Sequence, residues 1–229
     1  TYSGNKAEGN QYLMGRKNGS IIQEHGHQFE VDWEEGQKTG FFLDQRENRA
    51  LLQRYAADKT VLNTFSYTGG FSIYALKGGA KNVVSVDVSE KALALAEQNA
   101  KLNEVAERHE TRNADVFQFL KAQENQFGIV ILDPPAFAKS LRARHNAVIG
   151  YKRLNTMGLQ RVAKGGLLFT FSCSQVVDRQ LFLDTVRAAA IEAGRKVRIL
   201  HQLAQPADHP INIFHPEGEY LKGLVLEVE

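Results

Sequence analysis

Cysteine is nearly absent from this chain of 229 residues, which contains only Cys173. A single thiol excludes an internal disulfide and any zinc site built on several cysteines. Long apolar runs are also missing, since no stretch approaches the roughly 20 residues that a membrane helix requires. No secretory signal pattern opens the sequence. We therefore expect a cytoplasmic protein with no membrane partner, and the hydrophobic content of 43% is sufficient for one sizeable core.

The Gly-x-Gly-x-x-Gly fingerprint of dinucleotide-binding enzymes is missing as well. In its place, an apolar run over residues 60–65 leads to Tyr67-Thr-Gly-Gly-Phe71, and a second run over 83–86 ends at Asp87. This pattern predicts a strand, a glycine turn, a helix and a second strand whose terminal acid lines a ligand crevice. Glycines allow the backbone to approach a ligand closely, and the acid is placed to bind ribose hydroxyls. An ordinary glycine turn beside a surface acid explains these residues equally well.

Acidic residues are absent from residues 134–177. That stretch holds seven of the 28 Lys and Arg residues: Lys139, Arg142, Arg144, Lys152, Arg153, Arg161 and Lys164. The remaining 21 basic residues face all 26 acidic ones, which gives the rest of the chain a net charge of −5. Such a concentration favours contact with a polyanion over a merely solvated helix face. We assign Lys139, Arg142 and Arg144 to substrate binding.

The N-terminal part of the chain is polar and rich in glycine. Residues 20–24 and 28–33 alternate in polarity around His25-Gly-His27, which predicts a β-hairpin. We interpret the two histidines as turn residues, because no third metal ligand accompanies them. Asp44 is expected to cap a helix that runs to about residue 57.

Strands and helices are predicted to alternate through the rest of the chain. We expect strands over 60–65, 83–87, 109–113, 127–132, 167–171, 196–203 and 221–228, and helices over 71–77, 90–102, 116–122, 146–163 and 178–193. Gly165-Gly166 is expected to turn the chain before the fifth of these strands. The alternation predicts an α/β, Rossmann-like fold with a mostly parallel seven-stranded sheet and helices on both faces. Because a loop joins the last two strands, we expect the final strand to be antiparallel.

The motif Asp133-Pro-Pro-Ala-Phe137 follows a predicted buried strand. Pro134 and Pro135 fix φ and lack an N–H group, so the turn is stiff and its carbonyls can face outward. A carboxylate and carbonyl acceptors suit an exocyclic amine, and the Phe137 ring offers a face on which a base can stack. The alternative interpretation is a rigid loop closed by a hydrophobic plug.

Cys173 follows the next predicted strand. A lone cysteine is usually a small buried hydrophobe, but the carboxyl end of a parallel strand is where reacting groups are presented. A thiolate there can add to C6 of a pyrimidine and make C5 nucleophilic toward an electrophilic methyl group. A base must then remove the C5 proton, and Asp133 and Asp208 are the candidates.

Several of these motifs together resemble one enzyme family. They are Phe41-Phe-Leu-Asp-Gln-Arg46, Asn63-Thr-Phe-Ser-Tyr-Thr-Gly-Gly-Phe71, Val86-Asp-Val-Ser89, Asp133-Pro-Pro-Ala-Phe137, Ser172-Cys-Ser174, Asp208-His-Pro210 and Pro216-Glu-Gly-Glu-Tyr-Leu-Lys-Gly223. They are similar to signatures of class I S-adenosylmethionine-dependent methyltransferases, and specifically of the bacterial large-subunit ribosomal RNA cytosine-5 methyltransferase I family. The resemblance runs from about residue 38 to the end of the chain, so we expect a methyltransferase domain over 38–229 and a hairpin appendage over 1–37.

The resemblance implies S-adenosyl-L-methionine as cofactor and RNA as partner, specifically 23S ribosomal RNA. The oligomeric state is open, with a homodimer as one possibility. The implied roles are as follows: Tyr67, Gly69 and Gly70 hold the methionine end of the cofactor, Gln45 and Arg46 its carboxylate, and Asp87 its ribose. Asp115 lies near the adenine, Asp133 contacts the target base and the cofactor, and Cys173 is the nucleophile.

Two departures from the family pattern bear on these expectations. The chain begins at Thr1, and we expect a fragment that lacks the usual N-terminal PUA-type RNA-binding domain. Position 136 is Ala, where many RNA cytosine methyltransferases have a second cysteine, which implies a one-cysteine scheme. Methylation of guanine or another nitrogen target and an inactive RNA-binding relative are the alternatives. The missing glycine fingerprint and the Asp-Pro-Pro turn disfavour a nicotinamide dehydrogenase.

Overall fold

The computed structural model describes residues 20–33 and 40–229 of the chain. A small antiparallel sheet comes first, formed by β1 (Ile21–Glu24) and β2 (His27–Glu30). Its turn residues, His25 and Gly26, both have positive φ, of 48° and 82°. Two such residues form the turn that matches strand twist, so the predicted hairpin is confirmed. The remainder of the expected appendage, 1–19 and 34–37, lies outside the described residues.

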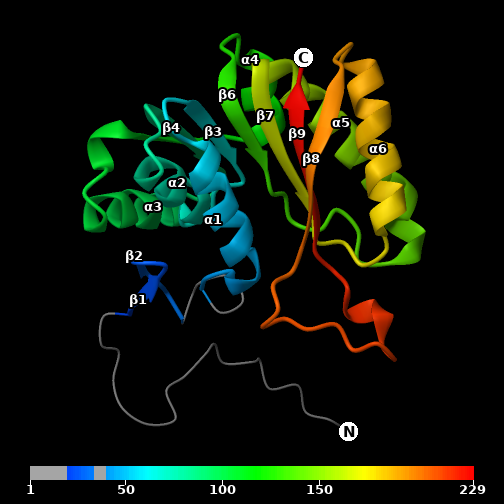
Figure 1. Ribbon diagram of the computed structural model, residues 1–229, viewed down its shortest axis with the longest axis horizontal. Coiled ribbons are helices and arrows are strands. Elements are labelled where there is room, and N and C mark those ends of the chain that lie inside the picture. Colours follow the sequence, from blue (N-terminus) through cyan, green and yellow to red (C-terminus); the bar gives the residue numbers. More distant parts are fainter. Residues whose placement is uncertain (1–19, 34–39) are drawn as a thin grey trace, which may run out of the picture.

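The main sheet has seven strands in the spatial order β5-β4-β3-β6-β7-β9-β8 (Figure 1). The strands are β3 (Thr60–Thr64), β4 (Asn82–Asp87), β5 (His109–Asn113), β6 (Phe127–Leu132), β7 (Val162–Ser172), β8 (Val197–Ala204) and β9 (Lys222–Val228). The first five in spatial order are mutually parallel, whereas β9 is antiparallel to both β7 and β8. The predicted Rossmann-like topology with an antiparallel last strand is therefore confirmed.

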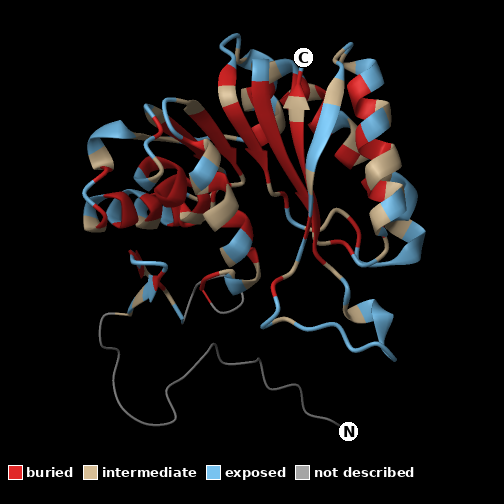
Figure 2. Cartoon of the chain, in the orientation of Figure 1, coloured by how far each residue is buried: buried red, intermediate tan, exposed pale blue. Residues whose placement is uncertain are grey.

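Helices cover both faces of this sheet. They are α1 (Arg46–Tyr55), α2 (Gly70–Lys77), α3 (Glu90–Leu102), α4 (Val116–Ala122), α5 (Arg144–Arg161) and α6 (Arg179–Glu192), with short 3₁₀ turns η1 (Leu43–Gln45), η2 (Ala106–Arg108), η3 (Leu141–Ala143) and η4 (Pro216–Gly218). Successive strand residues point to opposite faces. Val61 accordingly packs into the core under α1 and α2, and Leu62 into the core under α4, α5 and α6. Burial on both faces explains why the central strands are continuous apolar runs (Figure 2).

Two local predictions are wrong. Asp44 does not cap α1: it lies in η1, and Gln45 precedes the helix without a side-chain cap. The Asp44 carboxylate instead accepts a hydrogen bond from the Tyr220 hydroxyl, at 2.8 Å. Gly165-Gly166 does not precede β7 but lies within it, because Val162 already pairs with Phe127 before the register shifts. Gly165, with φ of 73°, forms part of this irregularity.

The helices within residues 20–33 and 40–229 are short or polar. None of the helices in these ranges combines the length and the apolar character that a bilayer-crossing segment requires.

Candidate active site

The predicted site residues follow strands that end at one edge of the sheet. Thr64 at the end of β3 pairs with Val86 of β4 on one side and with Leu132 of β6 on the other. Leu132 in turn pairs with Thr170 of β7. Because these strands are parallel, the segments that follow them leave the sheet at the same edge. The loop over 205–221 also leaves at this edge, because β8 runs in the same direction as β7 (Figure 1).

The loop between β3 and α2 has an unusual backbone. Phe65 and Tyr67 have positive φ, of 53° and 47°, although neither is a glycine. Left-handed conformations of this kind cost free energy and concentrate at functional sites. The loop is held by hydrogen bonds from the Ser66 amide to the Val86 carbonyl (3.1 Å) and from the Gly69 amide to the Ser66 carbonyl (2.9 Å). Helix α2 then begins without a side-chain cap, so its first N–H groups are available to a ligand.

Gly69 and Gly70 are required for helix packing. Gly69 has a positive φ of 79°, and a Cβ there would lie 3.0 Å from the Cβ of Ala96 in α3. A Cβ on Gly70 would lie 3.2 Å from Cδ of Arg49 in α1. The sequence prediction explained these glycines by close approach to a ligand. The structure shows that protein atoms occupy the space beside them, so cofactor contact through their backbone stays a prediction.

Asp87 ends β4, and its carboxylate organises two loops. One oxygen accepts the Tyr67 amide at 2.9 Å, and the other accepts the Ser89 amide at 3.0 Å. The carboxylate therefore fixes the strained loop after β3 and the start of α3. Each carboxylate oxygen retains a further lone pair. The half-buried Asp87 can thus still accept hydroxyl groups of a ligand.

Asp115 lies after the edge strand β5. Its Oδ1 accepts the Gln118 amide at 2.9 Å, so the residue is the N-cap of α4. The side chain is exposed. A capping role accounts for the acid at this strand end, and contact with an adenine stays a prediction.

The Asp133-Pro134-Pro135 turn places a half-buried carboxylate directly after the central strand β6. Phe137 turns back onto α5, where its ring centroid lies 4.5 Å from that of Tyr151. A Cβ on Gly150 would lie 3.0 Å from the Phe137 ring, so α5 packs closely against it. Phe137 is thus part of an aromatic cluster, as the hydrophobic-plug alternative describes. Base stacking on this ring stays a prediction.

Cys173 follows β7 and is half-buried, whereas the neighbouring Ser172 and Ser174 are 0% and 1% exposed. Cys173 is therefore partly exposed at the same edge as Asp133. Tyr151 and Tyr220 both interact electrostatically with it. Burial raises the pKa of Tyr151 to about 12, and it also raises the pKa of Tyr220, so both phenols are neutral at physiological pH.

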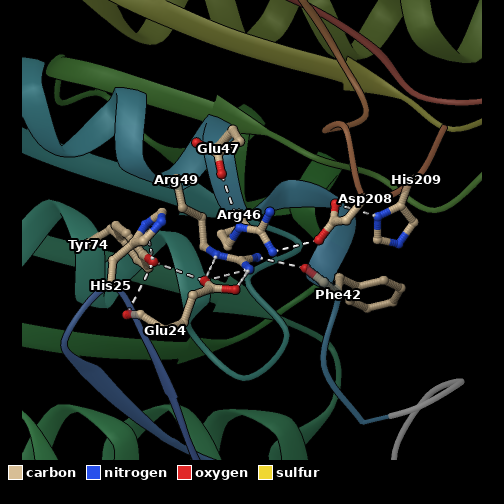
Figure 3. A network of polar contacts seen from close by, with 9 residues as sticks. All are labelled: Glu24, His25, Phe42, Arg46, Glu47, Arg49, Tyr74, Asp208 and His209. Carbon is tan, nitrogen blue, oxygen red and sulfur yellow. Dashed lines mark hydrogen bonds and ion pairs between the residues drawn. The ribbon is translucent and has the colours of Figure 1, made fainter.

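Arg46 and Asp208 form an ion pair, with Nη1 of the first 2.6 Å from Oδ2 of the second (Figure 3). The structure thus joins a predicted cofactor ligand to a candidate base. Hydrogen bonds from His209 and then from Arg46 lower the pKa of Asp208, while Glu47 and then Asp208 raise the pKa of Arg46. A lowered pKa makes Asp208 a weaker proton acceptor. Gln45 is 4% exposed, and its side-chain oxygen accepts from Asn48 at 2.6 Å.

The seven basic residues between 134 and 177 do not form one patch. Lys139, Arg142 and Arg144 are exposed near the start of α5, close to the site edge. Leu141, Arg142, Arg144, His145, Val148 and Leu181 line a shallow hollow there. Arg161 ends this 18-residue helix, roughly 27 Å from its start by helix rise, and Lys164 follows near the start of β7. Lys152 pairs with Glu192, and Arg153 lies over the Phe117 ring, so the first group is the one at the start of the helix beside the site edge.

The amino-acid sequence matches a known protein family. The model of the S-adenosylmethionine-dependent methyltransferase family matches residues 9–213. The chain belongs to the S-adenosylmethionine-dependent methyltransferase family. This agrees with the predicted fold and with the predicted cofactor.

Curated relatives of this methyltransferase include two proteins named ribosomal RNA large subunit methyltransferase I. The protein of Aeromonas salmonicida (strain A449) is 48% identical over 211 residues, covering 90% of this chain and 53% of the relative. The protein of Vibrio vulnificus (strain YJ016) is 45% identical over 235 residues, covering 97% and 59%. The chain therefore spans between half and three-fifths of the length of these relatives.

Solved structures share the methyltransferase fold. The crystal structure of SMU.776 complexed with SAH superposes with a TM-score of 0.84 at 29% identity, covering 95% of this chain and 58% of that one. The tRNA m1G37 methyltransferase of M. jannaschii has a TM-score of 0.65 at 20% identity, covering 96% and 60%. The second likeness shows the fold alone.

Sequence reasoning missed two buried charges in this methyltransferase. Arg49, 3% exposed, donates from Nε and Nη2 to the Glu24 carboxylate, each at 2.9 Å, and from Nη1 to the Phe42 carbonyl (Figure 3). Tyr74 donates to the same carboxylate at 3.0 Å. Lys222, 2% exposed, lies at the start of β9. Lys222 belongs to the family-like motif over 216–223, but nothing in that motif indicates that its side chain is buried.

Proposed function

We propose that this chain is the catalytic part of an RNA methyltransferase that forms 5-methylcytosine in large-subunit ribosomal RNA, the 23S RNA, through a covalent adduct on Cys173. The position of Cys173 carries the proposal. Its half-buried thiol follows β7 at the edge where Asp133 follows the neighbouring β6 and Asp87 ends β4. The names of the relatives support ribosomal RNA as the substrate.

The residues at the edge suit S-adenosylmethionine, which supplies an electrophilic methyl group when bound. Buried Oδ1 of Asp44 and Oγ of Ser66 have no hydrogen-bond partner among the residues that the structure describes. Such atoms are costly unless a ligand or water satisfies them. They lie just before α1 and just after β3, beside the residues assigned to the methionine end: Gln45, Arg46, Tyr67, Gly69 and Gly70. In this scheme Asp87 binds the ribose and Asp115 lies near the adenine.

Cys173 begins the reaction as a thiolate that bonds to C6 of the cytosine. The C5=C6 electron pair moves to C5, and C5 would take the methyl group of S-adenosylmethionine, with the electron pair of the S–CH3 bond left on the departing thioether. A base then removes the C5 proton, the C5=C6 double bond re-forms, and the Sγ–C6 bond breaks to release the thiolate. Asp133 accepts a hydrogen bond from the exocyclic amine. It is also the better candidate for the base, because the pKa of Asp208 is lowered by His209 and Arg46.

RNA is held beside this centre by groups on the segment after β6. Lys139, Arg142 and Arg144 are exposed and close to the edge, where cations contact phosphates. The stiff Pro134-Pro135 turn and the adjoining Phe137 shape the base pocket. Asp133 precedes this basic segment, and its carboxylate can accept a hydrogen bond from a base amine.

Cys173→Ala tests the proposal. RNA containing 5-fluorocytosine should form a covalent complex with the unmodified chain and S-adenosylmethionine, because fluorine at C5 blocks the elimination step. The variant should form none, and its methyl transfer to deproteinised large-subunit RNA should fall about a thousandfold or more. Calorimetric binding of S-adenosylmethionine should be retained, which excludes misfolding. Normal methylation by the variant would overturn the thiol mechanism and point to a nitrogen target such as guanine. Absence of cofactor binding by the unmodified chain would point to an inactive RNA-binding relative.

A further inference from the structure

The side chain of Lys222 reaches the backbone of the residues that follow Cys173. In the sheet, Lys222 pairs with Ser172 across β9 and β7. Its Nζ donates hydrogen bonds to the carbonyls of Ser174 (2.7 Å) and Val177 (2.6 Å). The Lys222 backbone is therefore paired with the residue before Cys173, and its amine binds the turn that follows Cys173. These contacts hold the turn that presents the thiol.

The amine is almost fully removed from water. Burial lowers the pKa of Lys222, whereas the adjacent Cys173 raises it. The other charged groups that act on Lys222 are engaged elsewhere. Glu219 pairs with Arg179 at 2.6 Å, and Asp178 caps α6 by accepting the Leu181 amide at 2.8 Å. Two neutral carbonyls do not compensate a buried ammonium. The Cys173 thiolate is the group best placed to do so.

Several other ionisable groups at this edge do not promote ionisation of Cys173. Tyr151 and Tyr220 are neutral phenols, since burial raises the pKa of each. Asp133, which like Cys173 acts on Tyr151, is a carboxylate and opposes a second negative charge. Asp44 and Asp208, which act on Tyr220, are negative as well. A nearby cation is the usual means of producing a reactive thiolate. Lys222, whose Nζ binds the carbonyl of the residue after Cys173, is a buried basic group beside it.

We propose that Lys222 is a positioning residue that fixes the turn after β7 and shares one proton with Cys173, so that the thiol ionises near neutral pH. The S–H bond of Cys173 breaks, an N–H bond forms on the Lys222 amine, and a thiolate–ammonium pair results. When the thiolate is released from the base, the same proton can return. The inference rests on the proposed function only for the fate of the thiolate. The ionisation itself is a property of the free protein.

The test uses the unmodified chain without RNA or cofactor. Because Cys173 is the only cysteine, the rate of alkylation by iodoacetamide between pH 5 and 10 reports one thiol. We expect the midpoint of this profile to lie at least about one pH unit below the ordinary value of about 8.5. A midpoint at or above the ordinary value would overturn the inference, whatever any variant does.

Lys222→Met removes the charge but keeps much of the volume. It should raise the midpoint and slow alkylation at pH 7 by about tenfold or more, because one pKa unit changes the thiolate fraction tenfold. Lys222→Arg should keep the midpoint low. The matched control is Lys164→Met, at the exposed far end of β7, which should leave it unchanged. A merely structural lysine would change the melting temperature without moving the midpoint, and that result would refute the inference.

The two proposals fail separately. A low, Lys222-dependent midpoint together with normal methylation by Cys173→Ala would refute the cytosine mechanism and leave the ion pair standing. An alkylation midpoint near the ordinary value of about 8.5, together with a covalent complex on 5-fluorocytosine RNA, would refute the ion pair and leave the cytosine mechanism standing. If Lys222→Met does not fold, the profile of the unmodified chain still decides the question.

Discussion

Arg46 and Arg49 lie one turn apart on α1 but occupy opposite environments (Figure 3). Arg49 is 3% exposed and forms a bidentate ion pair with Glu24, which is itself 4% exposed. Its guanidinium also lies 4.6 Å from the centre of the Phe41 ring. Arg46 and its partner Asp208 are 28% and 44% exposed. The same residue type therefore serves the scaffold at one position and the rim of the site at the other.

The difference follows from what each pair joins. The Arg49–Glu24 pair ties the hairpin to α1 and, through Tyr74, to α2, directly beneath Gly70. Burial makes its loss expensive, because an unpaired charge would remain in the interior. The Arg46–Asp208 pair ties the loop over 205–221 to α1 in water, where the gain is small. A ligand carboxylate can replace Asp208 there at little cost.

Breaking the buried pair should have the largest effect. Arg49→Met leaves the Glu24 carboxylate buried and unpaired, so the free energy of unfolding should fall by about 3–5 kcal/mol in urea denaturation. The matched control, Arg54→Met at an exposed position of the same helix, should change it by less than about 0.5 kcal/mol. Replacing Glu24 by Leu in the Arg49→Met background should recover part of the loss. If Arg49→Met lowered the free energy of unfolding no more than Arg54→Met, the buried ion pair would not be what stabilises this region.

His109 sharpens the comparison, because it is a partly buried ring that is hydrogen-bonded to a neutral hydroxyl. Its Nε2 lies 2.7 Å from the Ser85 hydroxyl, and burial lowers its pKa from 6.5 to about 4. As the pH falls, His109 therefore binds a proton in the unfolded chain before it does so in the folded chain. The stability associated with the neutral His109 is complete above pH 6.5 and is lost as the pH falls toward 4. Between pH 6.5 and 5 the loss should be about 2 kcal/mol. The free energy of unfolding, measured by urea denaturation at several pH values in this range, should depend less steeply on pH for His109→Gln than for the unmodified chain. Equal slopes would contradict the prediction.

Breaking the exposed pair should have the smallest effect on stability. Arg46→Met should change the free energy of unfolding by less than about 1 kcal/mol, and 1 M salt should abolish the difference. If Arg46 holds the cofactor carboxylate, calorimetry should show S-adenosylmethionine binding about tenfold more weakly, because a charge-assisted hydrogen bond is lost. The contrast between the two arginines would disappear if Arg46→Met destabilised the protein as much as Arg49→Met.

Local patterns predicted much of the fold and the position of the candidate site. Apolar runs that end in Asp87, Asp133 or Cys173 indicate buried strands, and parallel strands present such residues at one edge. The errors arose where a residue responds to a distant partner. Asp44 has the chemistry of a helix cap but bonds to Tyr220, 176 positions away. Gly165 has the chemistry of a turn, but pairing with β6 draws it into β7.

The sequence by itself determined the alternation of strands and helices, the edge of the sheet at which the candidate site residues follow the strands, and the presence of a single thiol there. These features depend on neighbours in the chain, whose spacing sets which way each side chain points. Only the tertiary structure decided the partners: Glu24 for Arg49, Asp208 for Arg46, and the carbonyls beside Cys173 for Lys222. Each of these contacts joins residues 25 or more positions apart, and burial decides its strength. No local pattern in the sequence records which distant residue is the partner or how deeply the contact is buried.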